Sequence, residues 1–318
     1  MSDLPDLTVI LASPRGFCAG VTRAVRIVSE ALKKVKTPVY VRHEIVHNKF
    51  VVQNLANKGA IFVNELDEVP DGAVVIFSAH GVPVSVLKEA ERRGLKTLDA
   101  TCPLVEKVHR EAKKNYAEGR KTLLIGHTGH PEVIGTMGQV PEGEMILIST
   151  VGQIKEIPDD WGRNLGYVTQ TTLSLDETEG LLGALRERFP NIVKPHRDDI
   201  CYATTNRQRA VKAIAEKCDL LMVIGAPNSS NSKRLVEVAK EAGCSRSVLV
   251  QRASEIEWDR LADVKTLGIT AGASAPAILV EEVLSELQKH FSVTVSEHTE
   301  VEEKVSFPLP ASLTEGEK

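Results

Sequence analysis

Three cysteines recur at the start of similar segments of the chain, and this repeat restricts the fold more than any other feature. The cysteines are Cys18, Cys102 and Cys201. Each opens an amphipathic run, and 28 or 29 residues later each repeat has a polar loop, at His47, His130 and Ser229 respectively. A fixed spacing with a matching pattern is the signature of an internal repeat. The sequence therefore predicts three copies of one unit, each bringing one thiol to a common centre.

Each repeat continues with the same order of elements. Apolar runs at 60–63, 144–149 and 247–251 are followed by a short acidic turn and then by a second strand-like run. The second strands end close to His80, Thr171 and Ser274. Strands that alternate with helices of about ten or more residues indicate βαβ units and parallel sheets. Because ligands bind at the carboxyl ends of such strands, we predict three similar α/β domains in a pseudo-threefold (trefoil) arrangement around one site.

The length of 318 residues allows two or three domains, and the repeat favours three. We expect a first α/β domain over 1–101, completed by the C-terminal segment 293–318, a second over 102–200 and a third over 201–292. The segment SVTVSEHTEVEEKVSFPLP is typical of an extended strand that wraps back on the first domain. Residues 311–318 are expected to form a frayed tail.

Composition excludes several classes of protein. With 42% hydrophobic and 26% charged residues the chain is neither disordered nor a membrane protein, and no apolar run approaches about 18 residues. The N-terminus carries acids where a signal peptide carries basic residues, so we expect a cytoplasmic protein with reduced thiols. A net charge of −4 and 4% aromatic residues give no basic field or stacking platform for nucleic acid. No glycine-rich dinucleotide or ATP motif occurs.

Three thiolates from three domains suit an iron–sulfur cluster or a zinc site. Each of these cysteines precedes a helical pattern, and a helix N-terminus stabilises a thiolate and a negative centre. Cys218 and Cys244 lie outside the repeat register, so we interpret them as packing residues. Three ligands leave one coordination position open, as in catalytic metal sites. A cluster of this kind combines a Lewis acid with a one-electron reservoir, which points to reductive chemistry on an oxygen-bearing substrate.

Nine segments, taken together and in order, carry a resemblance to a known family. They are SPRGFCAGV (13–21), VRHEIVHN (41–48), FSAHGV (77–82), DATCPLV (99–105), IGHTGHPEV (125–133), TQTTLS (169–174), DDICYATTNRQ (198–208), NSSNS (228–232) and TAGASAP (270–276). Over roughly 9–292 the chain resembles the 4-hydroxy-3-methylbut-2-enyl diphosphate reductases, the LytB-type iron–sulfur reductases of the methylerythritol phosphate route to isoprenoids. The resemblance implies a three-domain α/β trefoil around a [4Fe–4S] cluster with three cysteine ligands and one open iron.

By motif position the resemblance also implies the roles of individual residues. Cys18, Cys102 and Cys201 would hold the cluster. The diphosphate pocket would be lined by His47, His80, His130, Ser229, Ser230, Asn231 and Ser274. Glu132 and Thr171, together with His130, would handle the substrate hydroxyl and the proton.

The residue types fit these roles. The polar run 228–232 leads directly into a helix, where hydroxyls, amides and backbone N–H groups suit a diphosphate, and five polar residues in a row exceed what one helix cap requires. An imidazole offers donors to an anion. Glu132 falls in the first turn of a helix, and burial would raise its pKa toward that of a general acid. The remaining histidines are weaker candidates (His43, His127) or are expected to be solvated (His109, His196, His290, His298).

The implied reaction is a reductive dehydroxylation that gives isopentenyl and dimethylallyl diphosphate. A ferredoxin or flavodoxin type carrier would supply the electrons, since no flavin or nicotinamide motif is visible. Three alternatives stay open from the residues alone: a non-reductive [4Fe–4S] dehydratase or synthase of the quinolinate synthase type, a zinc hydrolase, and an iron–sulfur sensor. A sensor requires an output element, and the sequence has no basic DNA-reading helix or docking domain.

Overall fold

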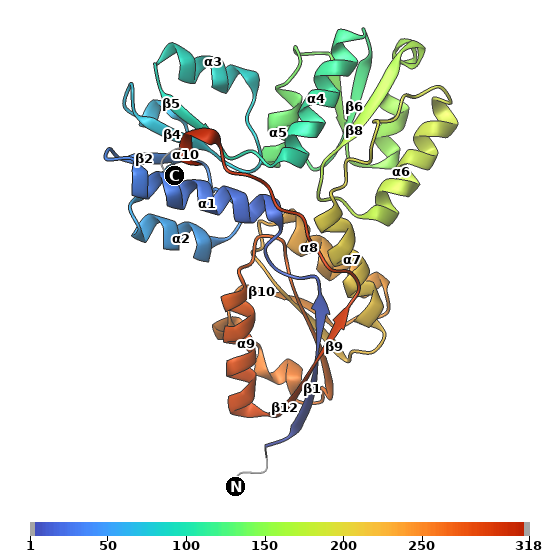
Figure 1. Cartoon of the computed structure of the whole chain (residues 1–318). Helices are drawn as coiled ribbons and strands as arrows, with labels where there is room; N and C mark the ends of the chain where they lie inside the picture. Colours follow the sequence, from blue (N-terminus) through green and yellow to red (C-terminus); the bar gives the residue numbers. More distant parts are fainter. Residues whose placement is uncertain (1–3, 315–318) are drawn as a thin grey trace. The chain divides into compact units, whose positions relative to one another are not determined.

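The structure of the chain, a computed structural model, describes residues 4–314 (Figure 1). Within this range the strands form three sheets, and all of the strand pairs in them are parallel. The described chain divides into two compact units. Residues 4–18, 47–51 and 202–305 form unit 1, and residues 19–46, 52–201 and 306–314 form unit 2.

Unit 1 contains a five-stranded sheet. Its strands, in spatial order, are β10 (Ser247–Val250), β9 (Leu220–Ile224), β11 (Thr266–Ala271), β1 (Asp6–Ser13) and β12 (Ser292–Thr299). Its helices are α7 (Tyr202–Ala215), α8 (Ser230–Glu241) and α9 (Ala277–His290). Alternate residues of β9 enter two different hydrophobic cores: Leu220 and Met222 pack with α9, and Leu221 and Val223 pack with α7 and α8 (Figure 1). Both faces of the sheet are therefore covered by helices, as parallel sheets require.

The first strand has different neighbours from those predicted. β1, which we expected to belong to the first domain, lies between β11 and β12 in the sheet of the third repeat. The apolar pattern of residues 6–13 identifies a buried strand, but that pattern does not specify which sheet it joins. The C-terminal segment does form an extended strand that folds back, but it joins the sheet of the third repeat and not one of the predicted first domain. It pairs along the whole of β1, from Asp6 opposite Ser292 to Ser13 opposite Thr299.

Unit 2 contains two sheets. The four-stranded sheet has the order β3 (Ala60–Val63), β2 (Val39–Arg42), β4 (Val74–Phe77) and β5 (Lys96–Asp99). The three-stranded sheet has the order β7 (Met145–Ile148), β6 (Lys121–Ile125) and β8 (Leu165–Thr169). The helices of these repeats are α1 (Ala19–Lys34), α2 (Lys49–Asn57), α3 (Val84–Arg92), α4 (Pro103–Ala117), α5 (Pro131–Met137) and α6 (Leu175–Arg188), of which α2 begins in unit 1.

Strands of the three-stranded sheet also divide their residues between two cores. Leu123 and Ile125 of β6 pack in one hydrophobic core with α6, and Leu124 packs in another with α4 and α5. The predicted acidic turns are short 3₁₀ helices: η1 (Leu66–Glu68), η2 (Val151–Glu156) with η3 (Asp159–Arg163), and η4 (Ala253–Glu255) with η5 (Trp258–Leu261). The element order predicted for each repeat is thus confirmed.

The end of the chain is more ordered than predicted. Residues 311–314, expected to be frayed, form the short helix α10 (Ala311–Thr314), in which Leu313 is buried. Its position is fixed on α1, because Lys34 Nζ donates to the Leu313 carbonyl and Arg23 Nε donates to the Pro308 carbonyl. One buried leucine and two charged donors on α1 are enough to hold this turn. The rest of the predicted tail, 315–318, lies outside the described residues.

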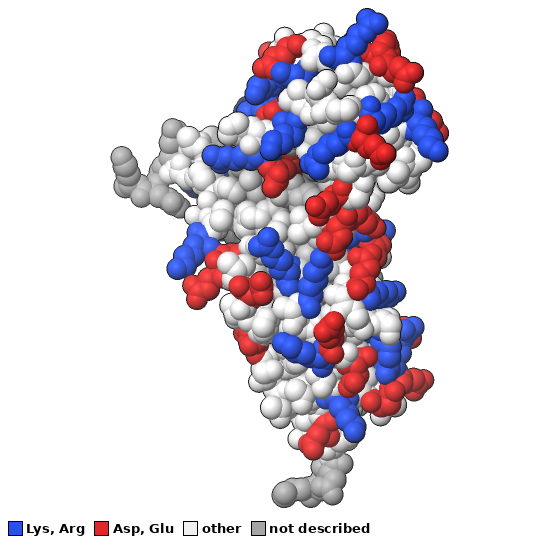
Figure 2. All heavy atoms as spheres, turned by 90° about the vertical axis from the view of Figure 1, so that its right-hand side faces the viewer, with Lys and Arg blue, Asp and Glu red and all other residues white. Residues whose placement is uncertain are grey.

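None of the helices in residues 4–314 combines the length and the apolar character needed to cross a membrane. On the face that Figure 2 displays, Lys and Arg side chains are interspersed with Asp and Glu side chains. The charge on this face is therefore of mixed sign, in keeping with the net charge of −4.

Candidate functional site

The three repeat cysteines occupy the same place in each repeat. Cys18, Cys102 and Cys201 directly precede α1, α4 and α7, so each thiol lies at the start of a helix of 14 to 16 residues. All three are partly buried, and none forms a disulfide. The partial positive charge at a helix N-terminus favours a thiolate there. The prediction that each repeat cysteine opens a helix is confirmed.

The backbone of each cysteine makes the same hydrogen bond. Cys18 N–H donates to the Ala273 carbonyl (3.3 Å), Cys102 N–H to the Ala79 carbonyl (3.0 Å) and Cys201 N–H to the Thr171 carbonyl (3.1 Å). These carbonyls belong to equivalent positions, because each lies two residues beyond the last residue of its strand (β11, β4 and β8 respectively). The repeat therefore extends to the hydrogen bonds that fix the cysteine backbone. The backbone of each cysteine is thus hydrogen-bonded just beyond the carboxyl end of a parallel strand, the edge at which ligands bind.

The other two cysteines have a different environment. Cys218 and Cys244 pack in the hydrophobic core between α7, α8 and the sheet of unit 1. Cys218 Sγ donates to the Ile214 carbonyl (3.2 Å), as a thiol and not as a thiolate. Burial raises the pKa of Cys218 to about 12 and also raises that of Cys244. The structure therefore supports the interpretation of both as packing residues.

The polar loop between β9 and α8 is organised around a serine that the sequence did not single out. Ser232 is completely buried, and its Oγ donates to Ser229 Oγ (3.1 Å), which also accepts from Ser232 N–H (3.3 Å). A Cβ added at Gly225 or Gly272 would lie only 2.2 or 2.1 Å from Ser232 Oγ. Glycines at the ends of β9 and β11 therefore leave room for Ser232, and Ser232 holds the helix cap Ser229 in place.

Asn231 is the most unusual polar residue of this loop. It is 4% exposed, and neither its side-chain oxygen nor its side-chain nitrogen has a hydrogen-bond partner among the described residues. A buried, unpartnered polar group costs about 1–3 kcal/mol, and most such groups in native proteins are satisfied. Asn231 therefore offers both a donor and an acceptor to a ligand that enters this loop.

Two other predicted residues of unit 1 lie next to each other. Ser274, which follows β11 and is 7% exposed, donates from Oγ to the His47 carbonyl (2.9 Å). The side-chain amide of Asn228 lies 3.5 Å from Nδ1 of His47. Residue Ser230 is partly buried at the first position of α8. Within unit 1 the polar ends of β9 and β11 thus meet the loop that carries His47.

In unit 2 the two predicted histidines are in ring contact. The rings of His80 and His130 are 5.9 Å apart and nearly perpendicular. Ser78 Oγ lies 3.2 Å from Nδ1 of His80. His130 caps α5, since its Nδ1 accepts from the Glu132 backbone N–H (3.2 Å). A nitrogen that accepts carries no proton, so in this arrangement the remaining N–H of His130 is on Nε2.

Glu132 is a buried acid whose carboxylate is hydrogen-bonded to Thr171. Its exposed fraction is 3%, and its carboxylate accepts from the Thr171 N–H (2.6 Å) and from the Thr171 hydroxyl (2.9 Å). Burial raises the pKa of Glu132 to about 7, although both hydrogen bonds from Thr171 act in the opposite direction. A carboxyl group with this pKa can hold and deliver a proton near neutral pH. The structure thus brings together the two residues predicted to handle the proton.

A second buried acid was missed from the sequence. Asp199, two residues before Cys201, is bound by Lys107 Nζ (2.8 Å) and accepts from the Thr169 N–H (2.9 Å). Burial raises the pKa of Asp199, and the Lys107 ammonium lowers it. The same ammonium also donates to the carbonyls of Arg197 and Asp198. This ion pair fixes the segment that leads into Cys201, and the adjacent acids of the DDIC motif were the signal for it.

The expectation for His109 was wrong. It is buried, at 9% exposed, and not solvated, because it lies on the inward face of α4 with Val105, Val108 and Ala112. Burial lowers the pKa of His109 to about 4. Its ring lies against Gly81, where φ is +78° and an added Cβ would be 2.6 Å from the imidazole carbon Cε1. Of the other histidines expected to be solvated, His196 and His290 are exposed and His298 is half-buried.

The donor set can be compared with what an iron–sulfur cluster requires. Such clusters are held by cysteine thiolates, and the chain supplies three thiols on equivalent, hydrogen-bonded helix starts, whereas its other two cysteines pack in or against a hydrophobic core and have raised pKa values. Cys18 belongs to unit 1, and Cys102 and Cys201 belong to unit 2. Among the described residues no three His, Cys, Asp or Glu side chains are grouped as a metal site. The chemistry of the repeat cysteines fits a cluster, and their joint ligation is a proposal.

The fold and these residues define a class: a parallel α/β protein built from three repeats, each with a thiol at a helix start, and with a buried acid near neutral pKa. The family described as LytB protein matches residues 9–288. The chain belongs to this family.

Curated relatives support the assignment over the whole chain. The chain is 56% identical over 314 residues to a 4-hydroxy-3-methylbut-2-enyl diphosphate reductase of Beijerinckia indica, with 98% of each chain covered. It is 57% identical over 316 residues to the enzyme of that name from Paracoccus denitrificans, with 99% of this chain and 100% of that one covered.

Solved structures give the same result. The E-1-hydroxy-2-methyl-but-2-enyl-4-diphosphate reductase of Plasmodium falciparum matches with a TM-score of 0.91 and 36% identity, covering 98% of this chain and 97% of that one. A second reductase structure, titled as the terminal enzyme of the non-mevalonate pathway, matches with a TM-score of 0.64 and 34% identity. It covers 89% of this chain and 99% of its own. These matches confirm the predicted α/β fold class.

Proposed function

We propose that the chain reduces 4-hydroxy-3-methylbut-2-enyl diphosphate to isopentenyl and dimethylallyl diphosphate, as the last step of the methylerythritol phosphate pathway. The observation that carries the proposal is the hydrogen bond that recurs at Cys18, Cys102 and Cys201 in a chain similar to named reductases over 98% of its length. The alternatives of a quinolinate synthase type enzyme, a zinc hydrolase or a sensor receive no such support.

The overall reaction removes one hydroxyl group and consumes two electrons and two protons. The bond between carbon and the hydroxyl oxygen breaks, the oxygen leaves as water after taking up one proton, and the allylic carbon skeleton takes up the other. Protonation at either end of that skeleton accounts for the two products. A [4Fe–4S] cluster, when bound, supplies electrons one at a time and a Lewis-acidic iron. Cys18, Cys102 and Cys201 would hold it.

The diphosphate would bind to the polar loop ends of the repeats. Asn231 supports this assignment, because a phosphate oxygen would satisfy the buried side-chain N–H group that has no partner in the described chain. Ser229, Ser230 and Ser274 add hydroxyl groups, and the N-terminus of the 12-residue helix α8 adds backbone N–H groups and a positive dipole. His47, His80 and His130 would complete the pocket as hydrogen-bond donors.

Glu132 would be the general acid. Its pKa of about 7 leaves a substantial protonated fraction at neutral pH, whereas a solvated glutamate would be almost fully ionised. The Thr171 hydroxyl, 2.9 Å from the carboxylate, connects this acid to a substrate hydroxyl bound beside it. His130 caps the helix on which Glu132 lies, so it would help to orient the carboxylate as well as contact the substrate.

The electrons would come from a ferredoxin or flavodoxin type carrier in the cytoplasm. The experiment is anaerobic turnover of 4-hydroxy-3-methylbut-2-enyl diphosphate by the full-length protein with a reduced one-electron donor. Both isopentenyl and dimethylallyl diphosphate should accumulate, and the protein should carry iron and sulfide with a broad visible absorption. A colourless zinc protein, or a cluster protein that turns over no diphosphate, would rule the proposal out.

A further inference from the structure

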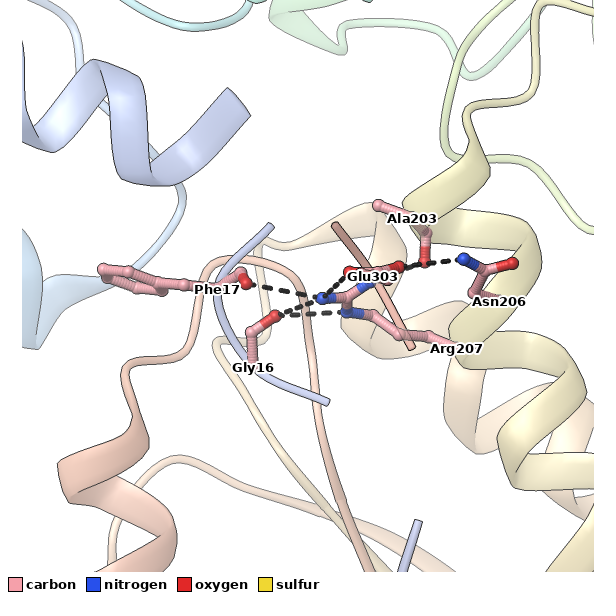
Figure 3. Close-up of polar contacts among 6 residues, drawn as sticks. All are labelled: Gly16, Phe17, Ala203, Asn206, Arg207 and Glu303. Atoms are coloured by element: carbon pink, nitrogen blue, oxygen red, sulfur yellow. Dashed lines mark hydrogen bonds and ion pairs between the residues drawn. The ribbon is translucent and has the colours of Figure 1, made fainter. Parts of the chain in front are cut away.

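One buried guanidinium connects distant parts of unit 1. Arg207, on α7, is 0% exposed. Its Nε and Nη2 donate to the Gly16 carbonyl (3.1 and 2.8 Å), and its Nη1 donates to the Ala203 carbonyl (2.9 Å) (Figure 3). The charge is balanced by the carboxylate of Glu303, which lies 3.0 to 3.3 Å from Nη1 and Nη2. An arginine buried this deeply requires both the ion pair and the carbonyl acceptors.

The acceptor at Gly16 belongs to the turn that leads to Cys18. Gly16 has φ of +66°, and an added Cβ would lie 3.1 Å from the Ala275 carbonyl oxygen, so the turn depends on glycine. Its N–H donates to the Ala271 carbonyl (2.9 Å). One side of the turn is therefore bound to the end of β11, and the carbonyl on its other side is bound by Arg207. Phe17 alone separates this fixed peptide from Cys18.

The other carbonyl acceptor belongs to Ala203, the second residue of α7, and Cys201 directly precedes this helix. Arg207 thus binds backbone carbonyls that are two residues from Cys18 and two residues from Cys201 along the chain. Its hydrogen bonds fix the separation between these two carbonyls. No other described side chain in unit 1 is fully buried and charged.

Glu303 comes from the C-terminal segment that follows β12. Its side chain is 15% exposed and also accepts from the Asn206 side-chain amide (3.0 Å). Its neighbours are different: Glu302 and Lys304 form an ion pair whose side chains are 77% and 85% exposed. Within this segment Glu303 is directed into the protein, toward Arg207 (Figure 3). The neighbouring Glu302 therefore provides a matched control.

We propose that Arg207 and Glu303 are a pair of positioning residues that hold the Gly16–Cys18 turn, and with it the Cys18 thiol, in the place required for a bound cluster. The inference rests on the proposed function, since it assigns a purpose to the position of Cys18. Neither residue is catalytic, because both act through the backbone next to the thiol. The C-terminal segment, which carries no predicted ligand, thereby becomes part of the support of the site.

The test uses full-length protein purified without oxygen, with Glu303→Ala, Glu303→Gln and the control Glu302→Ala. Changing the carboxylate leaves Arg207 in place and avoids the larger disruption of removing a fully buried side chain. The first measurement is hydrogen exchange of the amides in residues 14–18, compared with residues 220–224 in the centre of the same sheet. The second is iron and sulfide content with the visible spectrum.

In Glu303→Ala, exchange in residues 14–18 should be faster by about tenfold or more, with little change in residues 220–224. Its iron content should fall to roughly half or less, because a displaced ligand weakens the site. Glu303→Gln retains an oxygen acceptor for Arg207 and should give exchange between Ala variant and wild type. Glu302→Ala should match the wild type.

Two results would overturn the pairing: faster exchange confined to residues around 303, or an equal increase in residues 220–224, which indicates general loss of stability. Faster exchange at 14–18 with unchanged iron content and spectrum has a different meaning. It would uphold the support of the turn but overturn its role in placing Cys18 for a cluster. Failure of the proposed function is told apart from this, because the wild type itself would then lack the cluster or the turnover.

Discussion

The Glu132 carboxylate and Thr171 are joined by two hydrogen bonds, from the threonine N–H at 2.6 Å and from its hydroxyl at 2.9 Å. The residues are 39 positions apart in sequence and belong to helix α5 and to the loop after β8. Substituting Glu132 with Gln should separate binding from proton transfer, because the amide keeps the shape and one acceptor. Turnover should fall by roughly 10²–10⁴, while substrate still perturbs the cluster spectrum. Anaerobic kinetics with the exposed-site control Glu142→Gln measure this, and near wild-type turnover would assign the proton to another group.

The pH dependence of turnover follows from the same carboxyl group. Its pKa is raised to about 7, so the acid form predominates below that pH and is lost as the pH rises above it. Turnover at saturating substrate should therefore decline on the alkaline side of about pH 7, with one proton involved. The Glu132→Gln variant should lack this limb. A profile that is flat from pH 6 to 9 in the wild type would contradict the role of Glu132.

The repeat cysteines and Cys218 should respond differently to substitution by serine. Cys18→Ser, Cys102→Ser and Cys201→Ser should each lose most of the iron and sulfide, together with activity. Cys218→Ser should keep both, since that thiol packs against the hydrophobic core and burial raises its pKa to about 12. The measurement is iron and sulfide per chain after anaerobic purification. Loss of iron from Cys218→Ser, with retention in Cys18→Ser, would reverse the ligand assignment.

Asn231→Ala should weaken substrate binding without the usual loss of stability. A hydrogen bond to a charged group contributes about 1.5–3 kcal/mol, so KM should rise by roughly 10- to 150-fold with a smaller effect on kcat. The buried amide has no hydrogen-bond partner among residues 4–314, so its removal deletes no hydrogen bond within this range. Denaturant unfolding and steady-state kinetics measure the two effects, with the exposed Asn57→Ala as control. An unchanged KM would place the diphosphate elsewhere.

Burial of His109 should make the free energy of unfolding fall as the pH is lowered. Its folded-state pKa is lowered from 6.5 to about 4, so the unfolded chain takes up a proton below pH 6.5 that the folded chain refuses. The contribution of this pKa difference to the free energy of unfolding is fully present above pH 6.5 and is lost as the pH falls toward 4. It amounts to about 3 kcal/mol in total. Urea unfolding at pH 7.5 and 4.5 should show a smaller acid loss in His109→Gln than in the wild type. The exposed His290→Gln should behave as the wild type does.

The elements of the fold could be predicted because their signals are local. The cysteine spacing marked the repeat, and the residues after each cysteine formed helices α1, α4 and α7 as expected. The fold class needed only the order of strands and helices. The neighbour of β1 could not be predicted, because its apolar pattern fits more than one parallel sheet. His109 could have been predicted as buried, since it shares a helix face with Val105 and Ala112.

The contacts that support the candidate site join residues far apart in the sequence. They could therefore not be predicted from the local pattern around each residue. The hydrogen bonds between Glu132 and Thr171 join residues 39 positions apart within the second repeat. Lys107 and Asp199 are 92 positions apart, and Arg207 and Glu303 are 96 apart. From sequence alone, a single lysine or glutamate on a helix or tail is expected to be a solvated charge. Only the fold distinguishes the two buried ion pairs from the many exposed ion pairs of the chain.

Pairing of the first strand with the last has a consequence for the order of events during synthesis. β1 needs β11 and β12, which are encoded some 250 residues later, as its two neighbours. At translation rates of about 5–20 residues per second, the turn that ends at Cys18 waits on the order of tens of seconds for its supports. Until β12 has been synthesised the turn at Cys18 lacks these neighbours, and a chain truncated before residue 292 cannot complete this sheet. Cluster insertion that depends on a fixed Cys18 would then have to follow the synthesis of β12.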